Sequence, residues 1–371
     1  MNAPRNNNLG DAPVLIMAGG TGGHVFPALA VARALREQNE TVVWLGTERG
    51  LESRVVPADG LPLELVRVSG LRRKGALSWV LAPFKLLIAI WDAVSIVRRV
   101  QPKVVLGMGG FASGPGGFAA WLLRRPLVIH EQNAAAGLTN RLLAGMAREV
   151  LQAFPGAFSA KVAARTIGNP VRADIFDVTD PATRVSTDGN VRLLVLGGSQ
   201  GALVLNKTVP AAVRALSNIA AIDIWHQSGP STYEAAQQAY ADAEVEARVE
   251  PFIEDMKSAY EWADIVVCRA GALTIAELAA AGVGSLLVPY PSAVDDHQTK
   301  NGQVMVDAGA AILIPQADLT SQSLAAELRP LLEDRNRVVA MAVAAKTQAK
   351  PHATADLVNA CLEQCGEVRA A

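Results

Sequence analysis

The sequence predicts an α/β fold made of two Rossmann-like, doubly wound domains with a cleft between them. Short, continuous apolar runs alternate with longer helical stretches, which is typical of parallel sheets that helices cover on both faces. The chain has 371 residues, of which 50% are hydrophobic, and this is enough apolar material for two packed cores. In such folds, ligands bind near the carboxyl ends of the strands.

The predicted strands are short runs rich in Val, Ile and Leu. They are Val14–Met17, Thr41–Leu45, Val104–Leu106, Leu127–Ile129, Val191–Leu196, Ile222–Gln227, Ile265–Cys268 and Ser285–Val288. The helical segments between them include Phe26–Gln38, Ala211–Leu216, Tyr233–Ala243 and Ile275–Ala281. This order of elements is the alternation that a doubly wound fold requires.

The chain restarts near its middle. A polar, turn-rich stretch, Asp177–Asn190, suits a linker or the edge of a domain. A fresh strand, a glycine loop and a helix follow it, as they do at the start of the chain. We therefore expect two domains rather than an array of repeats.

Composition and charge narrow the function classes. The formal net charge of -1 gives no strong field that would attract nucleic acid, so no nucleic-acid partner is expected. The three cysteines form neither a zinc pattern nor a disulfide framework, which favours a reducing compartment. The first residues lack the apolar stretch of a secretory signal. Pro83, Lys85 and Asp92 interrupt the most apolar segment, Trp79–Val97, so we expect surface attachment rather than a membrane span.

Glycine-rich loops follow four of the apolar strands. They are Ala18–Gly23, Gly107–Gly117, Gly197–Gly201 and Ala270–Ala272. Glycine lets the backbone approach a ligand, and a following helix N-terminus offers N–H groups, which suits a diphosphate. Each loop alone could equally be a tight turn, but four together favour binding. The first loop lacks the dinucleotide spacing G-x-G-x-x-G, and the chain has no P-loop, so an NAD-dependent oxidoreductase is a weak alternative.

His24 directly follows the first glycine loop, at the entry to a helix. A histidine can remove a proton near neutral pH, for example from a sugar hydroxyl that attacks an anomeric carbon. It could equally cap the helix through local backbone hydrogen bonds. The position alone does not separate the two roles.

A run of four polar residues, His130 to Asn133, follows the strand PLVI. Four polar side chains at the exit of a buried strand favour a functional role, either hydrogen bonding to sugar hydroxyls or, for Glu131, proton removal. The alternative is a turn cluster in which Asn133 caps the next helix.

In the second half, Arg269 follows the strand IVVC, and Glu277 lies one turn into the next helix. A carboxylate at that place could accept both ribose hydroxyls of a nucleotide. Thr274 and Glu277 also have the spacing of a capping box, and the two interpretations are equally supported. Asp295 and Asp296 are consecutive rather than spaced like a metal cage, so no metal is expected, and Gln298 is a candidate for hydrogen bonding to a sugar.

Seven motifs stand in a fixed order along the chain. They are AGGTGGHVFPALAVA, GMGGFASGPGG, HEQNAAAGLTN, GNPVR, GGSQGA, CRAGALTIAELAAAG and DDHQTKN. Their order and spacing resemble the MurG family, the UDP-N-acetylglucosamine transferases of peptidoglycan synthesis. The resemblance runs from about Val14 to about Ala310. One departure lies in the second loop, where the family often has tyrosine and this chain has Phe111, so a phenolic hydroxyl is not required there.

The resemblance implies a GT-B fold with a donor site between its two domains. It implies inverting transfer of N-acetylglucosamine from UDP-N-acetylglucosamine to the 4-hydroxyl of the muramoyl sugar in undecaprenyl-pyrophosphoryl-N-acetylmuramoyl-pentapeptide (lipid I), which gives lipid II. It implies neither a divalent metal nor another cofactor. The expected parts are an acceptor and membrane-side domain over 1–171, a UDP-sugar domain over 172–349, and a tail over 350–371 that packs back on the first domain.

The resemblance also implies roles for single residues. His24 resembles the general base, with Glu131 as the second candidate. Glu277 resembles the ligand of the ribose, and Ile253 would frame the uracil through its backbone. The implied donor contacts are Thr21, Gly22, Gly23, Asn133, Arg172, Ser199, Ile253, Ala272, Leu273, Thr274, Ile275, Ala276, Glu277 and Gln298.

A basic stretch, Leu71-Arg72-Arg73-Lys74, precedes the apolar segment. Basic residues beside an amphipathic helix suit an anionic membrane surface, and the alternative is a core helix with a solvated loop. The same loop could hold the acceptor's pyrophosphate. We expect a peripheral protein on the cytoplasmic face of the bacterial inner membrane, with other cell-wall synthesis proteins as candidate partners.

Two rival functions stay open. One is another GT-B enzyme, such as a diacylglycerol glycosyltransferase or a UDP-sugar epimerase of related fold. The other, from a different class, is a non-catalytic UDP-sugar sensor or scaffold. The presence of His24, Glu131 and Glu277 argues against the sensor, and turnover would exclude it.

Overall fold

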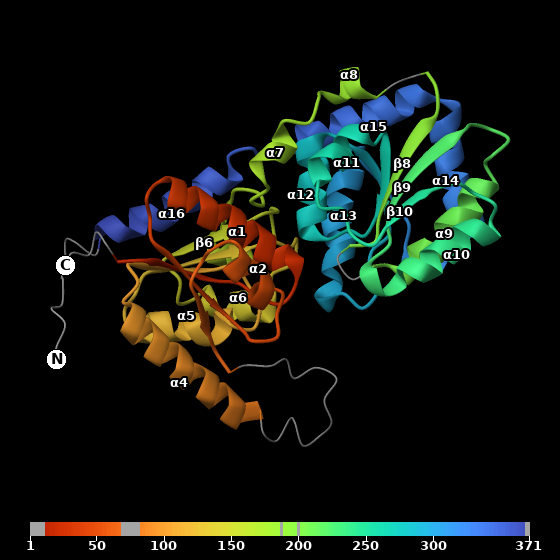
Figure 1. The fold of residues 1–371 in the computed structure, drawn as a ribbon. Coiled ribbons are helices and arrows are strands. Elements are labelled where there is room, and N and C mark those ends of the chain that lie inside the picture. Colours follow the sequence, from red (N-terminus) through yellow and green to blue (C-terminus); the bar gives the residue numbers. More distant parts are fainter. Residues whose placement is uncertain (1–11, 68–81, 186–187, 199–200, 368–371) are drawn as a thin grey trace. The chain divides into compact units, whose positions relative to one another are not determined.

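The computed structural model consists of two compact α/β units (Figure 1). The first unit extends to Pro170 and takes up the chain again from His352, whereas the second comprises Val171–Pro351. The structure describes residues 12–67, 82–185, 188–198 and 201–367.

The first unit has a parallel seven-stranded sheet in the order β3-β2-β1-β4-β5-β6-β7. Its strands are β1 (Val14–Met17), β2 (Val42–Gly46), β3 (Leu63–Leu65), β4 (Val104–Gly107), β5 (Leu127–Glu131), β6 (Glu149–Gln152) and β7 (Arg165–Thr166). Its helices include α1 (Gly22–Glu37), α2 (Glu52–Ala58), α4 (Ala82–Val100), α5 (Ser113–Leu122), α6 (Leu138–Leu143) and α16 (Ala353–Glu367).

Successive residues of β1 point to opposite faces of the sheet and therefore contribute to two cores. Val14 and Ile16 pack in the core that also contains residues of α1 and of the C-terminal helix α16, which lies beside α1 (Figure 1). Leu15 and Met17 pack in the core on the other face, with residues of α4 and α5. Because both faces are covered, the strand is apolar at every position rather than at alternate ones.

The second unit has a parallel six-stranded sheet in the order β10-β9-β8-β11-β12-β13. Its strands are β8 (Val191–Leu196), β9 (Ile222–Gln227), β10 (Arg248–Glu250), β11 (Ile265–Cys268), β12 (Gly284–Leu287) and β13 (Ala311–Leu313). Its helices include α7 (Ala173–Phe176), α8 (Pro181–Arg184), α9 (Leu203–Arg214), α10 (Tyr233–Asp242), α11 (Met256–Trp262), α12 (Ala272–Ala281), α13 (His297–Asp307), α14 (Ser321–Glu333) and α15 (Arg335–Thr347).

The predicted elements agree with this architecture, and the differences lie at their ends. Four predicted strands have the bounds of β1, β8, β9 and β11. Helix α1 begins at Gly22 rather than Phe26, so the last glycines of the first loop belong to a helical turn. The sequence did not predict β3, β6, β7, β10 and β13. Four of these strands have only two or three residues, which is too little apolar pattern to detect, and β6 (EVLQ) has a polar residue at each end.

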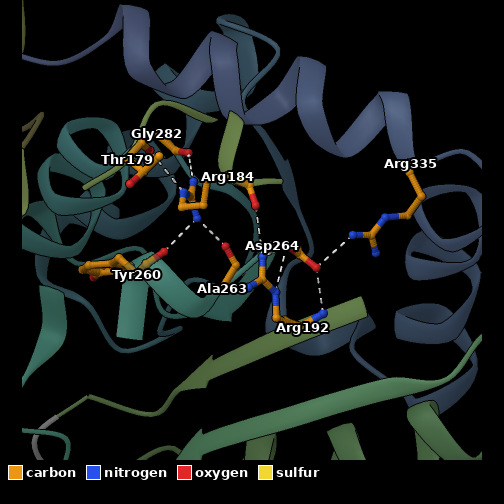
Figure 2. Close-up of polar contacts among 8 residues, drawn as sticks. All are labelled: Thr179, Arg184, Arg192, Tyr260, Ala263, Asp264, Gly282 and Arg335. Atoms are coloured by element: carbon orange, nitrogen blue, oxygen red, sulfur yellow. Dashed lines mark hydrogen bonds and ion pairs between the residues drawn. The ribbon is translucent and has the colours of Figure 1, made fainter. Parts of the chain in front are cut away.

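The polar stretch Asp177–Asn190 forms the edge of the second unit where the structure describes it. Its residue Arg184 is 8% exposed, and its guanidinium joins three segments of that unit (Figure 2). It donates hydrogen bonds to four backbone carbonyls, those of Thr179, Tyr260, Ala263 and Gly282. These bonds replace the water that a buried guanidinium loses, so this stretch is held against the unit.

A buried carboxylate next to this arginine joins further segments. Asp264 is fully buried and accepts hydrogen bonds from the Arg192 backbone at 2.9 Å and from its guanidinium at 2.7 Å. Nη2 of Arg335, the first residue of α15, donates to it at 2.8 Å (Figure 2). The carboxylate thereby connects β8, the start of β11 and α15.

Candidate functional site

Both units place glycine loops where the order of their strands reverses. In the first unit, the strand that follows β1 lies on one side and the strand that follows β4 lies on the other, so β1 and β4 flank the reversal. The loops after these strands touch, because a Cβ on Gly110, whose φ is +87°, would lie 2.4 Å from the carbonyl oxygen of Gly19. Only glycine permits this approach. In the second unit, β8 and β11 occupy the same places.

His24 lies in the first turn of α1, and its imidazole bonds to a side chain that follows β5. Nδ1 of His24 lies 2.9 Å from Oε1 of Gln132. Nε2 of the same amide donates to the carbonyl of Met108 at 3.0 Å, which turns the amide oxygen toward the imidazole. Nδ1 of His24 therefore carries the proton, and its Nε2 presents a lone pair.

The hydrogen bond of His24 rules out its role as a helix cap and adds Gln132 to the candidate site. The helix-cap role is wrong, because Thr21 is the N-cap residue of α1 and the His24 ring bonds to Gln132 instead. From the sequence, Gln132 is predicted only as a member of the polar run after β5. Gln132 directly follows β5 and His24 follows β1 of the same sheet, and this shared edge could have indicated from the sequence that the two residues lie close together.

Glu131 is 2% exposed and is already surrounded by donors. Its carboxylate accepts from the backbone and side chain of Asn133, at 3.0 and 3.1 Å. It also accepts from the Gly137 backbone at 3.1 Å and from Nδ2 of Asn140 at 2.8 Å. These four bonds shape the turn from β5 to α6, so Glu131 has a structural role in the loop that carries Asn133.

His130 points into the interior of the first unit. Its Nε2 bonds to the carbonyl of Gly168 at 2.9 Å, and the side chain is fully buried. Burial lowers the pKa of His130 to about 4, so it is neutral near pH 7. The imidazole therefore has a structural role: it packs in the interior and bonds to the carbonyl of Gly168.

Glu52 is a second site residue that the sequence does not predict. It is fully buried at the start of α2, and Oε2 accepts from the backbone N–H of Gly20 at 2.9 Å. Oε1 accepts from the backbone N–H of Thr47 at 3.0 Å and from its hydroxyl at 2.7 Å. A Cβ on Gly50 would lie 1.9 Å from this carboxylate, so a side chain at position 50 would displace it. Through its bond to Gly20, Glu52 stabilises the conformation of the first glycine loop.

Glu277 is the charged centre of the second unit's candidate site. It lies on α12, with 12% of its side chain exposed. Oε1 lies 3.9 Å from Nη2 of Arg172, and Oε2 accepts a hydrogen bond from the Tyr260 hydroxyl at 3.1 Å. Burial raises the pKa of Glu277 to about 7, and Asp174 also raises it, while Arg172 and Tyr260 lower it. The carboxyl therefore changes charge near physiological pH.

The capping-box interpretation of Thr274 and Glu277 is wrong. Helix α12 begins at Ala272 with Gly271 as its N-cap, so both side chains lie inside the helix. Ala272 and Ile275 are buried in the unit, whereas Leu273, Thr274, Ala276 and Glu277 are partly accessible. The N-cap residue Gly271 has no side chain that could cap α12. The helix follows β11 directly, so its N-terminus, the positive end of its dipole, lies near the carboxyl end of that strand.

The other predicted donor contacts lie at the ends of the strands of their own unit. The backbone N–H of Ile253 donates to Oε1 of Gln227 at 2.9 Å. Oε1 of Gln298 accepts from the Tyr290 backbone at 2.8 Å, which leaves its amide nitrogen as the group for a ligand. Thr21 is exposed, and Gly22 and Gly23 are partly exposed in the first turn of α1.

Some expectations lie outside the described residues. These are Ser199 and the stretch Leu71-Arg72-Arg73-Lys74. Arg269 has a structural role, since it donates to the carbonyl of Val288 at 3.1 Å and to Oε1 of Gln316 at 2.7 Å. Among the residues that the structure describes, no three His, Cys, Asp or Glu side chains converge on a point where a metal ion could sit.

Family models match both units. The N-terminal domain of glycosyltransferase family 28 matches residues 14–152, and its C-terminal domain matches residues 192–357. Together these matches cover most of the chain.

Curated relatives align over almost the whole length. A protein of Marinobacter nauticus is 54% identical over 94% of this chain and 96% of its own, and one of Alkalilimnicola ehrlichii is 55% identical over 95% and 99%. Both are named UDP-N-acetylglucosamine--N-acetylmuramyl-(pentapeptide) pyrophosphoryl-undecaprenol N-acetylglucosamine transferase.

Solved structures agree with the sequence relatives. The crystal structure of Acinetobacter baumannii MurG is 41% identical, with a TM-score of 0.82, over 94% of this chain and 99% of that one. The calicheamicin glycosyltransferase CalG4, at 17% identity and a TM-score of 0.64 over 95% and 98%, shares the fold.

Replacing Glu52 with Gln should destabilise the first unit. The new NH2 group faces either the Gly20 or the Thr47 backbone N–H, so one buried donor loses its acceptor. We expect the free energy of unfolding to fall by about 1–3 kcal/mol, measured by urea titration, and the Gly20 amide to exchange faster with deuterium.

The control is Glu64→Gln on β3, because that carboxylate pairs with Arg99 on the surface. It should unfold like the wild type. Equal stability of the Glu52→Gln variant and the wild type would mean that Glu52 does not hold the loop.

Proposed function

Since the chain belongs to the MurG family within glycosyltransferase family 28, we infer that it transfers N-acetylglucosamine from UDP-N-acetylglucosamine to lipid I and so forms lipid II. The relatives that carry this assignment align over at least 94% of the chain. The reaction belongs to peptidoglycan synthesis, and the fold that performs it is GT-B.

We propose His24 as the general base. The observation that carries this proposal is the pair of hydrogen bonds through Gln132, which places the proton on Nδ1 and leaves Nε2 free to accept one. The base would take the proton of the muramoyl 4-hydroxyl as its oxygen attacks the anomeric carbon, with inversion there. Glu131 is the weaker candidate, because its carboxylate is buried and already accepts four hydrogen bonds.

We assign the donor to the second unit. Glu277 would accept the two ribose hydroxyls, and Ile253 would offer its backbone carbonyl to the uracil, since its N–H is bonded to Gln227. As the glycosidic bond breaks, negative charge grows on the UDP leaving group. Arg172 and the N-terminus of α12 would stabilise that charge.

We propose further donor contacts for the other residues that the family resemblance implies. Asn133, on the loop that Glu131 shapes, and Gln298 would bond to the sugar. Ser199 would bind the diphosphate from the loop after β8. At the start of α1, the N-cap residue Thr21 and the first-turn residues Gly22 and Gly23 are the remaining proposed donor contacts of the first unit.

We propose that α4 attaches the first unit to the membrane surface. Four of its large apolar side chains, at helical spacing of three and four, are exposed: Phe84, Leu87, Ile88 and Trp91. Trp91 is 70% exposed and Phe84 65%. No helix of the described residues is long and apolar enough to span a bilayer. An apolar face of this kind suits insertion at the interface of the cytoplasmic leaflet, where lipid I would be reached.

The experiment that tests the function is transfer of labelled N-acetylglucosamine from its UDP donor to purified lipid I, with EDTA present. We expect robust formation of lipid II, because the proposed chemistry uses protein groups for every charge and proton. Tight UDP binding without transfer would move the acceptor assignment to another lipid. Transfer that stops in EDTA and returns with Mg²⁺ would refute metal independence.

Replacing His24 with Ala should lower kcat by about 10²–10⁴-fold, because the variant lacks the proposed general base. The dissociation constant of UDP, measured by calorimetry, should stay at the wild-type value. A matched control is His352→Ala, an exposed histidine of the same unit. Wild-type turnover of the His24→Ala variant would leave Glu131 as the better base.

Replacing both Phe84 and Trp91 with Ser should weaken binding to vesicles of anionic lipid at least about tenfold, because two large apolar side chains no longer leave water. Sedimentation with vesicles measures this. The control is Val343→Ser on α15, an apolar side chain of the second unit that is 41% exposed. Unchanged binding of the α4 double variant would exclude this helix as the attachment site.

A further inference from the structure

A buried tyrosine bonds to the carboxylate that we assign to the ribose. Tyr260 on α11 is fully buried, and its hydroxyl donates to Oε2 of Glu277 on α12 at 3.1 Å. Burial raises the pKa of Tyr260 well above its usual value, so the phenol stays protonated and remains a donor.

The two helices that carry this pair are held together at their C-terminal ends by one guanidinium. Nη1 of Arg184 donates to the carbonyls of Tyr260, at 2.7 Å, and of Ala263 (Figure 2). Nη2 donates to the carbonyl of Gly282, the C-cap of α12, at 2.5 Å. The same planar group therefore fixes the end of α11 against the end of α12, and the tyrosine and the glutamate face each other across the fixed helices.

The hydrogen bond also defines how the carboxylate is turned. Oε2 of Glu277 is bonded to the phenol, whereas Oε1 lies 3.9 Å from Arg172, beyond hydrogen-bond distance. Each carboxylate oxygen accepts more than one hydrogen bond, so lone pairs on both oxygens stay available for a diol. The Tyr260 hydroxyl thus orients the Glu277 carboxylate through Oε2 and leaves room on both oxygens for further hydrogen bonds.

We infer that Tyr260 is a positioning residue of the donor site, whose phenol holds the Glu277 carboxylate ionised and oriented to accept the two ribose hydroxyls. This inference rests on the proposed role of Glu277. It assigns Tyr260 no contact with the donor.

The pH dependence of UDP affinity follows from the groups around Glu277. Its pKa is about 7, and the groups that act on it are Arg172, Tyr260 and Asp174. A ribose diol bonds best to the ionised carboxylate, so UDP affinity rises with pH through this value and is lost below it. The phenol lowers the pKa of Glu277, so removing its hydroxyl moves this midpoint to higher pH.

The test is Tyr260→Phe, which removes one oxygen from a packed ring. We expect the dissociation constant of UDP at pH 7 to rise about fivefold to tenfold, the amount of one ordinary intramolecular hydrogen bond. Calorimetric titrations from pH 6 to pH 9 should show the midpoint moved upward. Titration of UDP itself cancels when the two proteins are compared with the same ligand.

A double-mutant cycle with Glu277→Gln separates positioning from a general loss of structure. In the Glu277→Gln protein, Tyr260→Phe should change UDP affinity less than twofold, because the charge that the phenol serves is gone. An equal loss in both backgrounds, or a Tyr260→Phe variant with the wild-type pH midpoint, would overturn the inference.

Tyr240→Phe is the matched control. Its hydroxyl is also buried in the second unit but bonds to Nδ1 of His226 at 2.8 Å. This variant should keep the wild-type UDP affinity and pH midpoint. If Glu277→Gln itself left UDP affinity unchanged, the proposed ribose site would fail, and that outcome differs from a failure of the tyrosine alone.

Discussion

All parallel strands of a sheet end at the same edge, and where the strand order reverses, the two central strands lead to helices on opposite faces of the sheet. In the first unit this constraint places the loops after β1 and β4 next to each other, and β8 and β11 flank the same reversal in the second unit. The loops can approach only where side chains are absent, as the contact between Gly110 and Gly19 requires. The close approach of the two loops therefore requires glycine at Gly110 whether or not a ligand is bound.

Buried polar groups keep these loops in shape. Glu52 and Glu131 are almost completely removed from water, and each carboxylate is compensated by N–H groups of the loop that it supports. A buried acceptor without such donors would cost several kcal/mol, so the loop conformation and the carboxylate depend on each other. His24 differs from them, since its hydrogen bond to Gln132 uses Nδ1 and leaves Nε2 available.

Much of the fold could be predicted from the sequence because the central strands are apolar on both faces and end in glycine. The bounds of β1 and β8 follow directly from that pattern. The edge strands could not be found, since β7 has two residues and both are exposed. Helix α12 illustrates another limit: Thr274 and Glu277 have capping-box spacing, yet Gly271 begins the helix three residues earlier.

The site residues divide in the same way. His24 and Glu277 could be proposed from their motifs. Gln132 also lies in a motif, but its role, like those of Glu52 and Tyr260, depends on a partner that the local sequence does not indicate. Gln132 reaches His24 over 108 positions, and no local pattern records such a pair.

The two units share one topology but differ in the charge that they bring to the edge of the sheet. The first unit offers the imidazole of His24, whose Nδ1 is bonded to Gln132, while the carboxylates of Glu52 and Glu131 accept hydrogen bonds from backbone N–H groups. The second unit offers the carboxylate of Glu277, which can accept further hydrogen bonds. Arg172, at 3.9 Å, and the N-terminus of α12 provide positive charge near it. A proton acceptor suits an attacking hydroxyl, and an arginine beside a helix N-terminus suits a departing diphosphate. This asymmetry gives a physical reason to place the acceptor's chemistry on the first unit and the nucleotide on the second.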